Sequence, residues 1–138
     1  MKKIDVFTHI WPKPFHNALI DHLGHTTDIT RRSEAVPMMT NLDRRFEVMD
    51  MFGPDYCQIL SLASPPYELY ADLAKSLDLA TIASDSMAEL CQQYPARFPG
   101  FIGTAIMSNP EQMVEDARRN IEDLGAVGMQ IFTNVMGK

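Results

Sequence analysis

The chain has 138 residues, of which 46% are hydrophobic, so it is long enough to bury the core of one globular domain. Its formal net charge of −6 argues against a surface that binds nucleic acid or anionic lipid, because both partners are themselves negatively charged. No apolar run approaches the roughly 18 residues of a membrane-spanning helix, and polar residues interrupt the N-terminal segment where a signal peptide would lie. We therefore expect a cytoplasmic protein with neither a nucleic-acid nor a membrane partner.

The first predicted element is a short strand over residues 3–7, which ends at the polar pair Thr8-His9. Residues 10–40 follow as an irregular insert, because proline and glycine recur in it. Apolar residues at helical spacing predict one short helix within this insert. The insert thus separates the first strand from the regular part of the chain.

Three helix–strand units follow the insert. Their predicted helices and strands alternate over residues 42–52, 56–62, 76–94, 101–106, 110–124 and 128–133. Asn109 and Pro110 are a strong helix start, since asparagine caps the free N–H groups and proline suits the first turn. Apolar strands that alternate with amphipathic helices predict parallel pairing through right-handed crossovers.

Two α/β folds fit such a series. A doubly wound sheet that binds nucleotides would carry a glycine-rich or lysine-bearing phosphate loop after its first strand, and this chain has neither. A TIM-type (β/α)8 barrel carries its chemistry on the loops after the strands, and the polar residues of this chain fall at those places. The predicted fold class is therefore α/β, a TIM-type barrel of which this chain covers about the first four strands.

Such a barrel needs about 250 residues. We therefore expect residues 1–138 to form a single domain that is the N-terminal half of a longer barrel. Four strands would also leave two unpaired sheet edges, which favour pairing with another chain. For this reason we expect a homo-oligomer, a dimer or larger.

Four sequence patches carry a family resemblance: Ile4-Asp5 with His9, the Pro65-Pro66 loop, Tyr94-Pro95-x-Arg97-Phe98, and Leu124 to Gln130. In this order and spacing, the chain resembles the N-terminal part of the amidohydrolase-related enzymes that include aminocarboxymuconate-semialdehyde decarboxylase and the resorcylate decarboxylases. The resemblance runs through the whole chain. It implies a barrel of the metal-dependent hydrolase type that acts on a small molecule.

The resemblance also bears on a metal site. In that family the first strand ends in His-x-His or Glu-x-His, whose two side chains bind a divalent metal. His9 matches the second ligand, but Phe7 stands at the first and cannot bind a metal. Two options stay open: a divalent ion such as Zn²⁺ held by His9 and two later residues, or no metal, as in some relatives that hydrolyse lactones. The remaining ligands and the catalytic residues are expected beyond Lys138.

A substrate pocket is predicted from residues at or just after the strand ends. They are Phe7, Trp11, Ser61, Ser64, Thr133 and Asn134. Phe7 either forms an aromatic wall or fills the barrel, and Trp11 either stacks on a planar substrate or packs against the insert. The other histidines, His16, His22 and His25, are expected to be loop residues in solvent.

The resemblance implies a substrate that is a small carboxylated aromatic, or a ring-cleavage product of one. The reaction is then hydrolysis or non-oxidative decarboxylation with loss of CO2. Two alternatives remain: a metal-independent lactone hydrolase on the same barrel, and a non-catalytic homologue or assembly module in which Phe7 marks a decayed site.

Overall fold

Four parallel strands form one sheet in the computed structural model, which describes residues 1–134. The strands follow the chain in the spatial order β1-β2-β3-β4, and each neighbouring pair is parallel. Their bounds are Lys3–Ile10, Tyr56–Leu62, Gly100–Gly103 and Gly128–Met129. The predicted α/β class with parallel pairing is therefore confirmed.

Five α-helices accompany the sheet. From α1 to α5 they span Lys13–Leu23, Asp28–Glu34, Leu42–Asp50, Leu73–Gln93 and Pro110–Arg118. A π-helical turn, Arg119–Asp123, continues α5, and short 3-10 turns lie at Pro37–Met39 and Tyr67–Leu69. None of the helices within residues 1–134 is long and apolar enough to cross a bilayer.

Side-chain caps fix where the helices begin. Asn41 accepts a hydrogen bond from the Arg44 amide, and Asn109 accepts one from the Gln112 amide. Asp72 caps α4 in the same way, so this helix begins at Leu73, three residues before the predicted start. At the other end of the last unit, Gly125 has a φ of 74° and ends the helical stretch, because glycine tolerates the left-handed conformation.

The segment 10–40 is more regular than predicted, because it holds α2 in addition to the one expected helix. Thr27 caps α2, and its buried side is made of Thr30 and Ser33, whose hydroxyls donate to backbone carbonyls within the same segment. Because the buried residues of α2 are hydroxyl residues and not apolar ones, the apolar periodicity of the sequence did not predict this helix. The expected strand over 128–133 is also shorter and is reduced to β4.

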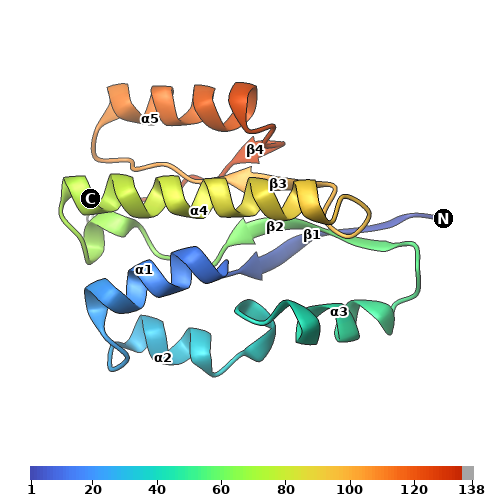
Figure 1. Cartoon of the computed structure of the whole chain (residues 1–138). Coiled ribbons are helices and arrows are strands. Elements are labelled where there is room, and N and C mark those ends of the chain that lie inside the picture. The colour runs from blue at the N-terminus through green and yellow to red at the C-terminus, as the bar shows by residue number, and fades with distance from the viewer. Residues whose placement is uncertain (135–138) are drawn as a thin grey trace.

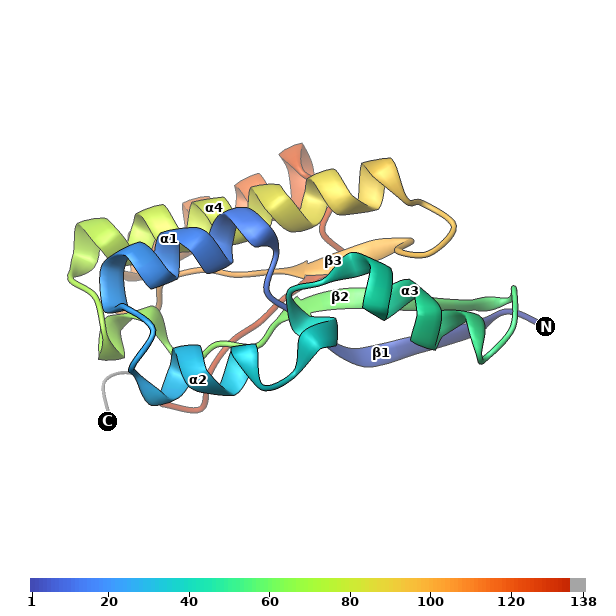
Figure 2. The ribbon, with the colours of Figure 1, turned by 60° about the horizontal axis from the view of Figure 1, so that its bottom comes forward.

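The helices cover one face of the sheet (Figures 1 and 2). Leu60 of β2 and Phe101 of β3 pack there against Phe15 of α1 and Leu79 of α4, and these side chains are at most 1% exposed. Removing such apolar surface from water is the main source of stability in this layer. The apolar faces predicted for the helices are therefore the ones that form the observed core.

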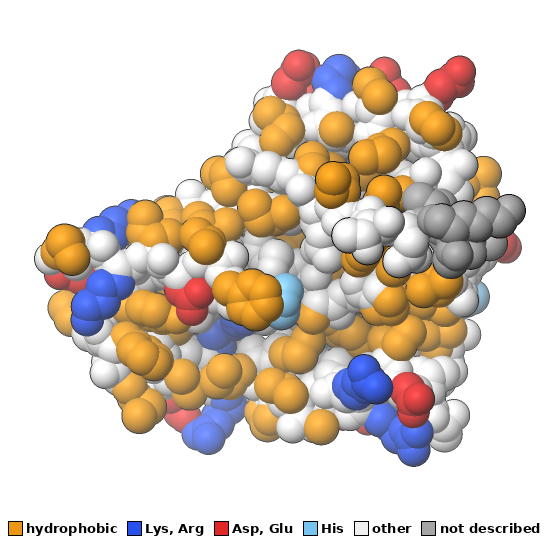
Figure 3. All heavy atoms as spheres, turned by 180° about the vertical axis from the view of Figure 1, so that it is seen from behind, with side chains coloured by type: hydrophobic (Ala, Val, Ile, Leu, Met, Phe, Trp, Pro, Cys, Tyr) orange, Lys and Arg blue, Asp and Glu red, His pale blue; other side chains and the backbone are white. Residues whose placement is uncertain are grey.

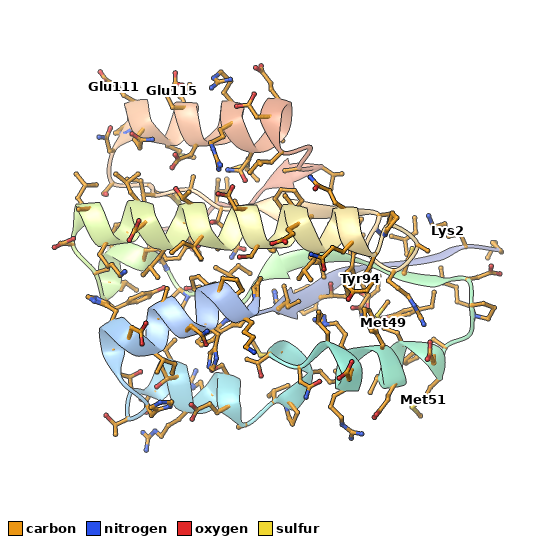
Figure 4. The ribbon with its side chains drawn as sticks, viewed as in Figure 1. Lys2, Met49, Met51, Tyr94, Glu111 and Glu115 are labelled. Atoms are coloured by element: carbon orange, nitrogen blue, oxygen red, sulfur yellow. The ribbon has the colours of Figure 1, made fainter. Side chains whose placement is uncertain are left out.

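The same division between buried and exposed side chains appears along the helix layer. Met49 of α3 is fully buried in the core, whereas Met51, just past the end of α3, is 82% exposed and points away from the sheet (Figure 4). Glu111 and Glu115 project from the outer side of α5, as expected for a solvated helix face. Amphipathic helices thus form a layer one helix thick over the sheet.

The opposite face of the sheet carries no helix among the described residues. Figure 3 shows this face, where hydrophobic side chains gather over the strands. The register pairs Ile4 with Cys57 and His9 with Ser61, and because neighbours in register share a face, these residues all lie on this side. We call it the open face.

A close approach joins β3 to the end of α5. Asn120 of the π-helical turn is 2% exposed and donates from Nδ2 to the carbonyls of Thr104 and Asp116. Its side chain lies directly over Gly103, where an added Cβ would come within 2.5 Å of Asn120 Oδ1. Glycine is therefore required at this point of β3.

Candidate functional site

The end of β1 is shaped by an irregularity in its pairing with β2. The register shifts between Asp5 and Thr8, so β1 contains one extra residue there. Asp5 holds this bulge, because its carboxylate accepts from the Phe7 amide at 3.0 Å and from the Tyr56 hydroxyl at 2.7 Å. The bulge sets how the last residues of β1 are presented.

Beyond the bulge, Phe7 and His9 project to the same side. Their rings meet edge to face with centroids 5.1 Å apart, and Phe7 is 82% exposed. This is the geometry expected of residues i and i+2 on a strand. Phe7 therefore stands beside His9 where the resemblance would place a first metal ligand.

A serine holds the imidazole of His9. The Nδ1 atom of His9 lies 2.9 Å from Ser61 Oγ, and Ser61 Oγ donates to the Thr8 carbonyl at 2.7 Å. The two residues are 52 positions apart and are brought together by the β1–β2 pairing. Ser61 is 9% exposed, and both hydrogen-bond partners of its hydroxyl lie on β1.

A buried arginine holds the backbone of the same residue. Arg45 of α3 is 4% exposed and donates to three oxygens: the His9 carbonyl, the Met38 carbonyl at 3.3 Å and Gln58 Oε1 at 3.2 Å. Burial lowers the pKa of the Arg45 guanidinium to about 10, and nearby Tyr56 and Asp5 oppose that shift. Arg45 therefore stays charged at neutral pH and links α3, β2 and the end of β1.

A pocket of about 510 Å³ opens between the insert and the loop after β2. Trp11, Ile29, Met39 and Pro65 give it apolar walls, while Arg32 and Ser64 add a guanidinium and a hydroxyl. Trp11 is 2% exposed, and its indole N–H donates to the Ala63 carbonyl, which fastens the end of β1 to the β2 loop.

Of the two charged side chains that line this pocket, Asp28 is paired within residues 1–134 and Arg32 is not. Asp28 also lines it, but its carboxylate is paired with Arg31 at 2.5 Å. Arg32 has no ion-pair partner among residues 1–134 and offers its charge to the pocket. The pocket is thus suited to a flat, partly apolar molecule that carries a negative group.

The predicted pocket residues are only partly brought together. Trp11 and Ser64 line the 510 Å³ pocket, and Ser64 Oγ also lies 2.7 Å from the Tyr70 hydroxyl. Phe7 and Ser61 lie with His9 on the open face instead. The other two, Thr133 and Asn134, are exposed near the end of the described chain.

The other histidines divide into two groups. His22 and His25 are exposed, as predicted, although His22 lies on α1 and not in a loop, and His25 pairs with Glu34 at 2.7 Å. His16 is instead half-buried in α1, where it packs against Trp11, and burial lowers the pKa of its imidazole. The prediction of a solvated loop residue was therefore wrong for His16.

The described residues do not by themselves make a metal site. Within residues 1–134, no three histidine, cysteine, aspartate or glutamate side chains lie close enough to hold one ion. The imidazole of His9 can bind a metal ion through nitrogen, but the phenyl ring of Phe7 beside it offers no metal ligand. A metal held by His9 together with two more such side chains would need those two from outside residues 1–134.

Comparison with known proteins identifies the family. The model of the family described as Amidohydrolase matches residues 4–138. The chain belongs to this family. The family predicted from the sequence is thereby confirmed.

Curated relatives of this amidohydrolase chain are decarboxylases. It is 36% identical over 110 residues to gamma-resorcylate decarboxylase of Polaromonas sp., which covers 80% of this chain and 33% of that protein. It is 29% identical over 150 residues to 2-amino-3-carboxymuconate-6-semialdehyde decarboxylase of Dictyostelium discoideum, covering 99% of this chain and 42% of that one. The chain thus spans from 26% to 42% of the length of the curated relatives it matches.

Solved structures agree on the fold. A 5-carboxyvanillate decarboxylase of Novosphingobium aromaticivorans, complexed with manganese, matches with a TM-score of 0.74 at 25% identity, over 99% of this chain and 43% of that one. A dihydroxybenzoic acid decarboxylase of Polaromonas sp., with manganese and the inhibitor 2-nitroresorcinol, matches with a TM-score of 0.70 at 29% identity, over 93% and 37%. These neighbours are amidohydrolase-type barrels, so the predicted barrel class, with four strands in this chain, is confirmed.

Sequence reasoning missed two arginines. Arg45 lies three residues after Leu42 and four before Met49, in phase with the apolar side of α3, and a charged residue in that phase signals a buried polar contact. Arg32 lies on α2, which was not predicted, so nothing in the sequence pattern placed it beside Trp11.

Proposed function

We propose that this chain belongs to a non-oxidative decarboxylase whose substrate is a small carboxylated phenol or a related ring-cleavage acid. The observation that carries the proposal is the placement of His9. Its imidazole lies at the C-terminal end of β1, where barrel enzymes keep their chemistry, and Trp11 of the pocket follows two residues later. The decarboxylase relatives support this reaction over hydrolysis.

Decarboxylation requires the pocket to hold the substrate ring in one orientation and to keep bulk water away from it. A proton adds to the ring carbon that bears the carboxylate, the bond to the carboxylate carbon breaks, its electron pair returns to the ring, and CO2 leaves. The apolar walls at Trp11, Ile29 and Pro65 suit a flat ring and shield one side of it from water. Arg32 pairs with an anionic oxygen of the substrate and sets its orientation.

A divalent metal, when bound in such enzymes, polarises a substrate oxygen as a Lewis acid. We propose manganese or zinc for this protein, and the manganese in the two family neighbours supports the former. Of the described residues, His9 is the one at the end of β1 that can offer a ligand. Elemental analysis of the purified protein distinguishes the two ions.

The assembly and location expected from the sequence complete the proposal. Strands β1 and β4 are the outer strands of the described sheet. We propose a cytoplasmic homo-oligomer, and light scattering of the purified protein measures its mass. A monomeric mass would contradict the proposed homo-oligomer and would leave the proposed decarboxylation unaffected.

The activity is tested by CO2 release from hydroxybenzoates and carboxylated phenols, with Mn²⁺ or Zn²⁺ added. We expect His9→Ala to lower kcat/KM about 100-fold or more, as loss of a group at the reacting centre does. His25→Ala is the matched control, because His25 is an exposed histidine of the insert that pairs with Glu34. Arg32→Ala should raise KM more than it lowers kcat.

Three results would count against the proposal. No CO2 release from any of these acids would contradict decarboxylation. Hydrolysis of lactones without added metal would favour the metal-independent hydrolase. Equal activity of His9→Ala and the parent protein would remove His9 from the site.

A further inference from the structure

The Ser61 hydroxyl has a single proton, and the structure shows where that proton goes. Ser61 Oγ lies 2.7 Å from the Thr8 carbonyl oxygen, which can only accept a hydrogen bond. The hydroxyl proton is therefore donated to Thr8. What remains on Ser61 Oγ is acceptor capacity, and it lies 2.9 Å from His9 Nδ1.

We infer that Ser61 is a positioning residue that holds neutral His9 as the Nδ1–H tautomer. Since the Ser61 oxygen has only lone pairs left to offer, His9 Nδ1 must carry the proton in this contact. The lone pair of the imidazole is then on Nε2. His9 presents that lone pair on the open face as a ready ligand or base.

Two other contacts keep the ring in this orientation. Arg45 donates to the His9 carbonyl and fixes the backbone from the helix side. Phe7 meets the His9 ring edge to face at 5.1 Å and packs against it on the open face. A half-turn of the imidazole would replace Nδ1 by a carbon opposite Ser61, so the serine bond opposes such a turn.

The value of this arrangement to catalysis rests on the proposed function, because it concerns the same histidine. A partner that fixes the tautomer of a metal-binding histidine commonly changes metal affinity by about 10- to 100-fold. The tautomer itself can be measured without any metal or substrate. The two ideas can therefore fail separately.

The test uses ¹⁵N-histidine-labelled protein without added metal, at a pH about two units above the ordinary histidine pKa of about 6.5. His9 is assigned from the signals that His9→Gln removes, and nitrogen shifts then tell which ring nitrogen carries the proton. We expect the Nδ1–H form in the parent protein and in Ser61→Thr, which keeps a hydroxyl. Ser61→Ala should shift the tautomer ratio toward Nε2–H by roughly fivefold or more, as loss of one buried hydrogen bond allows.

Ser76→Ala is the matched control. Ser76 is a fully buried serine on α4 whose hydroxyl donates to the Ala71 carbonyl, so its removal tests the general effect of losing a buried serine. The His9 tautomer should be unchanged in this variant. An Nε2–H form in the parent protein, or the same shift in Ser76→Ala as in Ser61→Ala, would overturn the inference.

Mn²⁺ titration of the same proteins separates the inference from the proposed function. Ser61→Ala should weaken His9-dependent Mn²⁺ binding about tenfold or more, and Ser61→Thr should restore it. If the tautomer changes as expected while the parent protein binds no Mn²⁺, the positioning role stands and the metal part of the proposed function fails.

Discussion

The two faces of the sheet differ in what their residues contribute, and β2 shows the difference within three residues. Leu60 and Leu62 turn toward the helices and are at most 1% exposed, whereas Ser61 between them turns to the open face and bonds to His9. The covered face is held by apolar packing. On the open face a few polar bonds fix side chains in place, so stability and the candidate site should respond to different substitutions.

The largest effect should come from the covered face. Leu60→Ala removes a fully buried side chain from the middle of the core and should lower the free energy of unfolding by about 3 kcal/mol. Urea unfolding followed by tryptophan fluorescence measures it, with Trp11 as the probe. Ile59→Ala, on the open face of the same strand, should cost less than half as much. Equal costs for the two variants would break the comparison.

A smaller loss should follow from the buried arginine that links α3, β2 and the end of β1. Arg45→Met leaves the oxygens of His9, Met38 and Gln58 without their donor and should lower the free energy of unfolding by about 2 kcal/mol. Arg44→Met is the control, since Arg44 is exposed and its guanidinium is paired with exposed Glu47, and should cost less than about 0.5 kcal/mol.

The pH dependence of that loss follows from the pKa of Arg45. Burial places the folded-state pKa at about 10, below the ordinary value, so at lower pH both the folded and unfolded states hold the proton. The stability difference between the parent protein and Arg45→Met should therefore stay constant from about pH 6 to pH 9. Above about pH 10 the unfolded state holds more protons, so the parent protein should gain stability relative to the variant. A marked drift near neutral pH would contradict a charged Arg45.

The smallest change in stability should be at the open face. Phe7→His replaces an 82% exposed side chain and should alter the free energy of unfolding by less than about 0.5 kcal/mol. It also creates a His-x-His pair with His9, so Mn²⁺ affinity should rise about tenfold or more in a calorimetric titration. Phe7→Gln, which has no comparable donor, is the control. Unchanged affinity in Phe7→His would mean that Phe7 does not stand at a ligand position.

Much of the fold could be predicted from local patterns. Apolar periodicity and the caps at Asn41 and Asn109 gave the helices after the insert, and strand alternation put Phe7 and His9 on one side. Helix α2 could not be found in this way, because its inner side consists of Thr30 and Ser33.

The candidate site was harder to predict because its contacts cross between distant parts of the chain. His9 meets Ser61 only when β1 and β2 pair in a register that the bulge after Asp5 shifts by one residue. No pattern within β1 reports the register of its partner strand. The role proposed for His9 stays a prediction that the His9→Ala variant tests, and the pocket roles of Trp11 and Ser64 stay predictions as well.

The close approach of Asn120 to Gly103 has a consequence for how this chain can vary. Any residue larger than glycine at 103 would place its Cβ on the asparagine side chain, and this clash cannot be relieved within β3 itself. An alteration at 103 would become acceptable only after the turn at 119–123 had moved. Substitutions at the two positions are therefore coupled: a smaller side chain at 120, or a shifted turn at 119–123, would have to precede any larger residue at 103.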